Sequence, residues 1–139
     1  MSKQSEKRDT GCPIAFSLDV FGDKWSLLIV RDLLLVGHKT YGQCLGSKER
    51  ISTNILADRM KRLEAEGIIN KSSDPNNRKS YIYSLTKKGL DLAPIVLEAI
   101  KWGGAHDPNT IAPDSILNRI ENDRDNFLTE IRSYHTPKE

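Results

Sequence analysis

The middle of this chain constrains its fold more than any other part, because it predicts one amphipathic helix with clear ends. Leu56, Met60 and Leu63 recur at i, i+4 and i+7, so they share one face of a helix. Ser52 stands where an N-cap belongs, and Gly67 stands just past the last periodic residue, where a left-handed C′ residue is common. The pattern therefore predicts a helix of about four turns that begins after Ser52.

Two strand-like segments follow this helix. Residues 68–71 and 80–85 are rich in β-branched and aromatic side chains, which favour strands. The segment between them, residues 74–79, combines turn-forming Asp, Pro and Asn with two cations, Arg78 and Lys79. A helix, a strand, a basic loop and a second strand in this order predict a winged helix-turn-helix, with the loop as its wing.

Three shorter helices are expected before this unit. Residues 13–21 form the first, with Pro at a position where its missing N–H costs nothing, and residues 24–36 form the second. Residues 40–45 form a short helix capped by Thr40. This short helix is the expected first helix of the helix-turn-helix, and residues 46–50 are its turn.

The C-terminal half is predicted to be helical. A helix capped by Thr86 runs to about residue 104 with a bend at Pro94, and an acidic amphipathic helix covers residues 114–134. An apolar stripe that follows a complete small domain is buried either against that domain or against a second chain, and we favour a second chain. The expected fold class is mainly α with a small β-hairpin, a winged helix-turn-helix with terminal dimerisation helices.

A chain of 139 residues is enough for one domain with extensions. We divide it into a flexible N-terminal arm (residues 1–11), a winged helix-turn-helix domain (12–104) and a C-terminal helical extension (105–139). Residues 38–88 hold 11 Lys or Arg against 5 Asp or Glu, whereas residues 89–139 hold 5 against 9. This asymmetry favours a surface for a polyanion in the middle of the sequence, although ordinary solvated faces can also produce it.

Other classes of protein find little support in the sequence. Two cysteines cannot form a disulfide framework, which favours a protein of the reducing cytoplasm. The longest apolar stretch is too short for a membrane span. We find no phosphate loop, nucleophile elbow or convincing carboxylate pair, so we expect neither an enzyme nor a cofactor. His38, His106 and His135 lie far apart without ligand spacing, so no metal site is expected and a metal-responsive regulator is a lesser alternative.

Several separated motifs together resemble the HxlR-type family of winged helix-turn-helix transcriptional regulators, relatives of the MarR group. They are Cys12-Pro13, Gly22-Asp23-Lys24-Trp25, residues 63–69 (LEAEGII), Tyr83-Ser84-Leu85-Thr86 with Gly89, and Trp102-Gly103. The resemblance covers about residues 12–103 and implies a DNA-binding homodimer held together by its terminal helices. The chain departs from the family in having Tyr41 where Phe is usual, and in a wing with less proline.

The geometry of helix-turn-helix proteins assigns the candidate DNA contacts. The N-terminal part of the second helix meets base edges in the major groove, and flanking cations meet phosphates. The residues expected to read bases are Ser52, Thr53, Asn54, Ala57 and Lys61. The residues expected on phosphates are Lys48, Arg50 and Arg62, with Arg78 and Lys79 of the wing on the adjacent minor groove or backbone. Arg59 lies nearer the apolar stripe and is expected to be structural.

Cys12 is the candidate regulatory residue. A thiol at a helix start gains thiolate character from the macrodipole, and some members of the family use this cysteine to sense quinones, aldehydes or oxidants. The resemblance therefore implies an electrophile or oxidant as effector, whereas an inert cysteine under the first helix is the alternative. Cys44 is expected in the core. A winged-helix protein-protein module without DNA binding remains a further alternative function.

Overall fold

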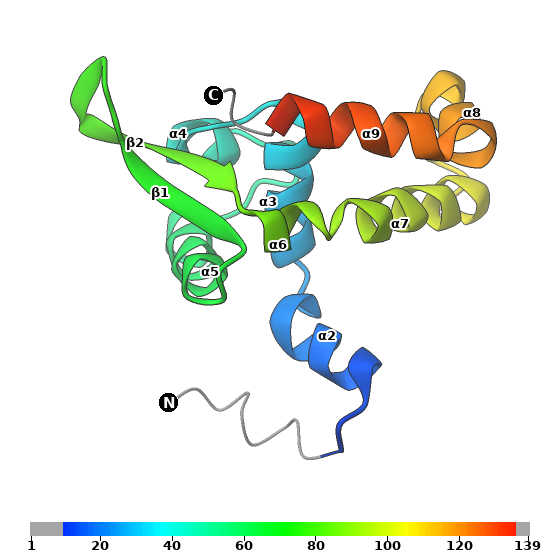
Figure 1. The fold of residues 1–139 in the computed structure, drawn as a ribbon, viewed down its shortest axis with the longest axis horizontal. Coiled ribbons are helices and arrows are strands. Elements are labelled where there is room, and N and C mark those ends of the chain that lie inside the picture. The colour runs from blue at the N-terminus through cyan, green and yellow to red at the C-terminus, as the bar shows by residue number, and fades with distance from the viewer. Residues whose placement is uncertain (1–9, 136–139) are drawn as a thin grey trace.

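The computed structural model describes residues 10–135 of the chain, so the predicted arm at residues 1–11 falls almost wholly outside the described part. Figure 1 shows a small helical body from which a long β-hairpin projects at one end. The elements in chain order are α2 (Pro13–Phe21), α3 (Ser26–Arg31), the π-helix η1 (Asp32–Val36), α4 (Tyr41–Leu45), α5 (Thr53–Ala65), β1 (Ile69–Asp74), β2 (Asn77–Leu85), α6 (Lys87–Leu90), α7 (Ala93–His106), α8 (Asp114–Asn122) and α9 (Arg124–His135).

The predicted helix caps are confirmed. The Thr40 hydroxyl accepts a hydrogen bond from the Gln43 N–H, and the Gln43 side chain returns to the Thr40 N–H in a capping box. Ser52 accepts from the Ile55 N–H at 3.3 Å, and Thr86 accepts from the Gly89 N–H at 3.0 Å. Each hydroxyl satisfies one of the backbone donors that a helix start leaves without an intrahelical partner.

The end of α5 forms a Schellman motif. Gly67 has φ +75°, the Ile68 N–H donates to the Leu63 carbonyl at 2.9 Å, and the Gly67 N–H donates to the Glu64 carbonyl at 3.0 Å. Because a side chain at this φ would be strained, glycine is the residue that ends the helix at lowest cost. The motif turns the chain directly into β1.

The hairpin is longer and its turn shorter than the sequence predicts. β1 and β2 pair antiparallel from Ile69 opposite Leu85 to Asp74 opposite Asn77, with an irregularity after Ser73. The predicted loop at residues 74–79 is therefore wrong, because Arg78 and Lys79 belong to β2. A tight turn in which the Asp74 carboxylate accepts the Asn76 N–H reverses the chain, and pairing the next residues satisfies backbone groups that a loop would leave to water.

The second predicted helix, residues 24–36, is instead an α-helix followed by a π-helix. The Asp23 carboxylate accepts from the N–H groups of Trp25 and Ser26 at 3.0 and 3.1 Å, so it caps the start of α3. From Asp32 the chain widens into η1, which ends at Gly37. Periodicity does not distinguish α from π turns over five residues, so only the structure reveals η1.

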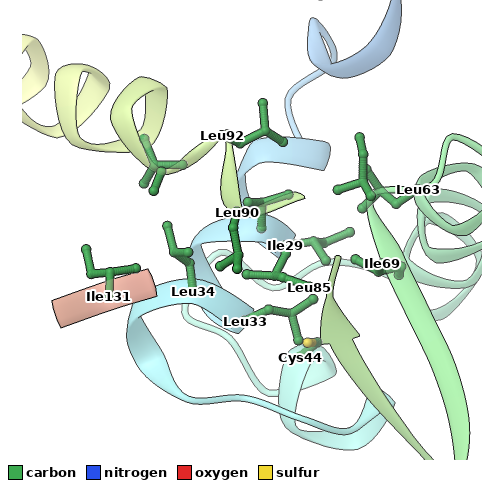
Figure 2. Close-up of a cluster of buried hydrophobic side chains, with 14 of the residues drawn as sticks. Ile29, Leu33, Leu34, Cys44, Leu63, Ile69, Leu85, Leu90, Leu92 and Ile131 are labelled. Carbon is green, nitrogen blue, oxygen red and sulfur yellow. The ribbon is translucent and has the colours of Figure 1, made fainter. Parts of the chain in front are cut away.

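One core joins the helices to the base of the hairpin. Figure 2 shows buried side chains of α3, η1, α5, both strands and α6 converging. Leu56 and Leu63 of α5 are 0% and 1% exposed, and Cys44 of α4 is 1% exposed. The predicted apolar stripe of α5 and the core placement of Cys44 are confirmed. Burying each leucine contributes about 2 kcal/mol, so these side chains fix how α5 is presented.

The C-terminal helices differ from their predicted form. The helix expected from Thr86 is broken into α6 and α7, and Pro94 stands in the first turn of α7, where proline is tolerated. The single helix expected over residues 114–134 is interrupted at Asp123, whose φ of −141° is not helical. The Asp123 carboxylate accepts from the side chains of Arg119 and Asn126, which stabilises this break.

The apolar stripe of α8 and α9 is buried within the chain. Ile120 and Ile131 are 1% and 6% exposed, and both helices lie along α7 (Figure 1). A Lys101–Glu121 ion pair of 2.7 Å joins α7 to α8. The centre of this stripe is therefore packed against α7 and η1 of the same chain, and burying it does not require the second chain that the sequence analysis favours.

Helix α2 carries apolar side chains that remain exposed. It projects from the body of the molecule (Figure 1), and none of its residues is buried in the described chain. Ile14 and Leu18 are 71% and 58% exposed. Trp102 and Ile95 of α7 add further exposed apolar surface, 67% and 39% exposed. None of the described helices is long and apolar enough to cross a membrane.

Candidate nucleic-acid interface

The outer face of α5 is polar and open to solvent. All of the side chains that the sequence assigns to DNA contact are exposed, on α5, on the turn before it and on β2 alike: Lys48, Arg50, Ser52, Thr53, Asn54, Ala57, Lys61, Arg62, Arg78 and Lys79. The acidic helices α8 and α9 lie on the opposite side of the molecule from α5 (Figure 1). The face of α5 is therefore not masked by the chain's own acidic segment.

The first helix of the motif holds the start of α5. The Tyr41 hydroxyl on α4 donates to the Thr53 carbonyl at 2.9 Å, while Cys44 packs from the same helix into the core. In the turn between the helices, Arg50 adopts φ +58°, a conformation that is uncommon for residues other than glycine. These contacts position the exposed N-terminal turn of α5, which carries Asn54, against the rest of the motif.

An ion pair fixes α5 from its other side. Arg59 Nε donates to the Asp23 carboxylate at 2.8 Å, and Arg59 also pairs with Asp58. Arg59 is therefore engaged inside the protein, as its place near the apolar stripe predicts. Partial burial by itself would raise the pKa of Asp23, but hydrogen bonds from Ser26, Arg59 and the Trp25 N–H outweigh it and hold this pKa below its usual range.

The Asp23 carboxylate should thus contribute a stability that depends on pH. The pKa of Asp23 is lower in the folded state than in the unfolded state, where it is about 3.9. The carboxylate therefore contributes its full stability above about pH 3.9, and this stability is lost as pH falls through the folded-state pKa. Asp23→Asn should lower the free energy of unfolding by about 2 kcal/mol at pH 7, since it removes the charge from four hydrogen bonds. It should also flatten the decline of stability below about pH 4.

Urea unfolding between pH 2.5 and 7, followed by circular dichroism, measures both effects. Glu64→Gln is the matched control, because Glu64 is an exposed acid on α5, and it should change stability by less than about 0.5 kcal/mol. Equal losses in the two variants would remove Asp23 from its anchoring role.

The hairpin adds cations beside this face. Arg78 and Lys79 are exposed on β2, and Lys71 on β1 lies with its Nζ 4.1 Å from the ring centre of Tyr81. Lys71 was not predicted, because the expected wing cations were placed in the loop alone. Residues 70–73 are polar and all exposed, and this polar run beside the wing is the signal that could have found it.

The two cysteines have opposite environments. Cys12 is exposed at the residue before α2, whereas Cys44 is buried, and burial more than the nearby Asp32 carboxylate raises the pKa of its thiol to about 12. Only a thiolate reacts readily with disulfide reagents. The chain therefore presents one accessible thiol and keeps the other one protonated in the core.

Labelling with a chromogenic disulfide reagent at pH 8 should consequently detect one fast thiol per folded chain and two in guanidinium chloride. Cys12→Ser should remove the fast thiol, and Cys44→Ala should leave it in place. Fast reaction of the Cys12→Ser protein would show that Cys44 is accessible in the folded state.

The structure also gathers three metal-binding residue types that the sequence does not place together. Atoms of Asp32, His38 and Cys44 that can bind metal all lie within 4.8 Å of one another. Their positions in the sequence do not match the repeated histidine and cysteine spacings of metal-binding motifs. They come from η1, from the loop after it and from α4, so only the fold brings them together.

Comparison with known proteins shows that the helix-turn-helix and hairpin part of the chain is similar to transcriptional regulators. The family model described as HxlR-like helix-turn-helix matches residues 20–110. An uncharacterized HTH-type transcriptional regulator of Synechocystis sp., sll1512, is 36% identical over 92 residues, which cover 66% of this chain and 67% of that protein.

Solved structures agree with this result. The crystal structure of the transcription-factor candidate PA1607 is similar with a TM-score of 0.67 and 34% identity, over 78% of this chain and 72% of that chain. The redox regulator HypR in its oxidized form is similar with a TM-score of 0.59 and 32% identity, over 68% of this chain and 97% of that chain.

Proposed function

The chain belongs to the HxlR-like helix-turn-helix family of transcriptional regulators, which are not enzymes, and we propose that it binds double-stranded DNA as a homodimer and represses transcription. The observation that carries the proposal is the exposed polar face of α5, which Tyr41 of α4 and Asp23 before α3 hold by hydrogen bonds. In helix-turn-helix proteins this face enters the major groove.

The individual contacts follow from chemistry and position. Asn54, in the first turn of α5, can hydrogen-bond bidentately to adenine, and Lys61 reaches guanine or a phosphate. Ser52, Thr53 and Ala57 complete the surface towards the bases. Lys48, Arg50 and Arg62 neutralise phosphates, and the wing cations Arg78 and Lys79 meet the adjacent minor groove or backbone.

The second subunit is proposed to dock on α2. Apolar surface that a second copy of the chain can bury is exposed at Ile14 and Leu18 of α2 and at Trp102 of α7. A closed homodimer has a twofold axis, so the operator should be an imperfect palindrome with half-sites separated by about one helical turn or a small multiple of it.

A double Ile14→Glu, Leu18→Glu variant should therefore be monomeric while it keeps its circular dichroism spectrum. Sedimentation velocity measures the change. Ile111→Glu is the control, because Ile111 is 79% exposed but lies outside α2 and α7. A dimer that survives the double variant and dissociates in the control would place the interface elsewhere.

A gel shift on the DNA upstream of the protein's own gene tests the function itself. Wild type should bind with an affinity that falls steeply as salt rises, because phosphate contacts release counterions. Asn54→Ala should weaken binding while its unfolding free energy stays the same, since Asn54 is exposed. Absence of any salt-dependent shift would leave the protein-protein module as the function that remains.

Regulation is proposed to act through the Cys12 thiol in a reducing cytoplasm. This thiol is exposed next to α2, so an electrophile or oxidant that modifies it would change the surface proposed for the dimer. The similar protein HypR is described as a redox regulator. Diamide should release DNA from wild type but not from Cys12→Ser, and equal release from both would exclude Cys12 as the sensor.

A further inference from the structure

The Asp32, His38 and Cys44 cluster lies inside the motif, away from the exposed face of α5. Asp32 Oδ2 and His38 Nδ1 are 3.7 Å apart, and the potential ligand atoms of all three residues lie within 4.8 Å of one another. Ligand atoms around a tetrahedral zinc ion are separated by about 3.3–3.8 Å, as its bond lengths require. The Asp32–His38 spacing already fits, and the cysteine needs only a small approach.

Asp32 is held with one oxygen free for a ligand. Its Oδ1 accepts hydrogen bonds from Arg31 Nε and Nη2 at 3.0 and 2.7 Å, and Arg31 is itself fixed by two hydrogen bonds to Glu49. Oδ2 faces His38 instead. Such outer hydrogen bonds orient the carboxylates of metal sites.

His38 supplies the second observation. Among the described residues, its Nδ1 is buried and has no hydrogen-bond partner, because 3.7 Å to Asp32 is too long for a hydrogen bond. A buried polar atom without a partner costs free energy. The backbone holds the residue in this place, since the His38 N–H donates to the Asp32 carbonyl at 3.0 Å at the end of η1.

The charge around the cluster is suited to a divalent cation. With Cys44 as a thiolate, Asp32, Glu49 and Cys44 carry three negative charges, and Arg31 and Lys48 carry two positive charges. The excess around the cluster is negative, which favours a cation. A cavity of about 910 Å³ is lined by Asp32 and His38 and opens between η1, residues 46–49 and α7, so it offers an entry path and room for a water ligand.

We propose that Asp32, His38 and Cys44 form a binding site for a divalent transition-metal ion of the zinc class, with the fourth position open to the cavity. Mixed carboxylate, imidazole and thiolate donors select such ions over Mg²⁺ or Ca²⁺, which prefer oxygen ligands alone. On binding, the Cys44 thiol releases its proton to solvent and its sulfur binds the metal. The ion would link η1 to α4, the first helix of the motif.

A cobalt(II) titration of the full chain, freed of metal by a chelator and kept reduced, tests this site. Wild type should develop a thiolate-to-cobalt charge-transfer band that saturates at one ion per chain, and zinc should displace the cobalt. Cys44→Ala should lose the band. His38→Gln should weaken cobalt binding at least about tenfold, because it removes the imidazole ligand.

Matched controls keep the outcome decisive. Cys12→Ser and His106→Gln alter the other cysteine and an exposed histidine, and both should bind cobalt as wild type does. Because His38 is partly exposed, His38→Gln stays interpretable even if Cys44→Ala fails to fold. Absence of the band in wild type, a band that depends on Cys12, or unchanged binding in His38→Gln would each overturn the proposal. The assay contains no DNA, so its result is independent of the proposed operator binding.

Discussion

Lys61→Glu should weaken operator binding at least about 30-fold. A lost contact from this position costs about 1–3 kcal/mol, and a twofold-symmetric dimer loses the contact in both half-sites. In each half-site the glutamate is also repelled by the DNA phosphates, which weakens binding further. Lys61 is exposed on the same face of α5 as Asn54, whereas the negative charge of Asp58 on this helix is already paired with Arg59 and Arg62.

Fluorescence anisotropy with a labelled operator, measured over a series of salt concentrations, checks this prediction. The slope of log affinity against log salt should become shallower by about 2, one unit for each subunit. Lys87→Glu is the matched control. It makes the same charge change at an exposed residue in the first turn of α6, where a negative side chain is tolerated. Equal losses in both variants would indicate a general charge effect instead of a contact from α5.

Gly89→Ala should lower the free energy of unfolding by about 3 kcal/mol and the melting temperature by roughly 10 °C. A Cβ at Gly89 would overlap the Ile68 carbonyl oxygen and lie 3.1 Å from a methyl group of Leu85. The approach is this close because Thr86 donates from both its N–H and its hydroxyl to the Ile68 carbonyl, at 3.0 and 3.1 Å. The start of α6 is thereby docked on the backbone just before β1.

Thermal unfolding by circular dichroism measures the loss, and Gly42→Ala is the control. Gly42 is also helical, but a Cβ there meets nothing within 4 Å, so alanine should be neutral or stabilise by up to about 1 kcal/mol. A Gly89→Ala protein as stable as wild type would mean that α6 and β1 separate easily. The hairpin would then be held to the body less firmly than the Thr86 contacts indicate.

The candidate DNA surface could be predicted because it follows from local rules. Helical spacing put Leu56 and Leu63 inwards, and the opposite side of the same helix had to face solvent. Ser52, Thr40 and Thr86 were predictable as caps because capping joins residues that are close in sequence. The wing cations were placed in a loop instead of a strand, because a turn propensity does not reveal how far pairing extends.

The sequence by itself determined the order of the elements, the inward and outward faces of α5 and the concentration of cations around it, because each depends on neighbours within a few residues along the chain. Only the tertiary structure decided that α8 and α9 pack on their own chain, that apolar side chains of α2 stay exposed, and that Asp32, His38 and Cys44 converge. An apolar stripe on a helix requires burial, but the stripe does not specify which surface covers it. That choice depends on how segments distant in the sequence pack together.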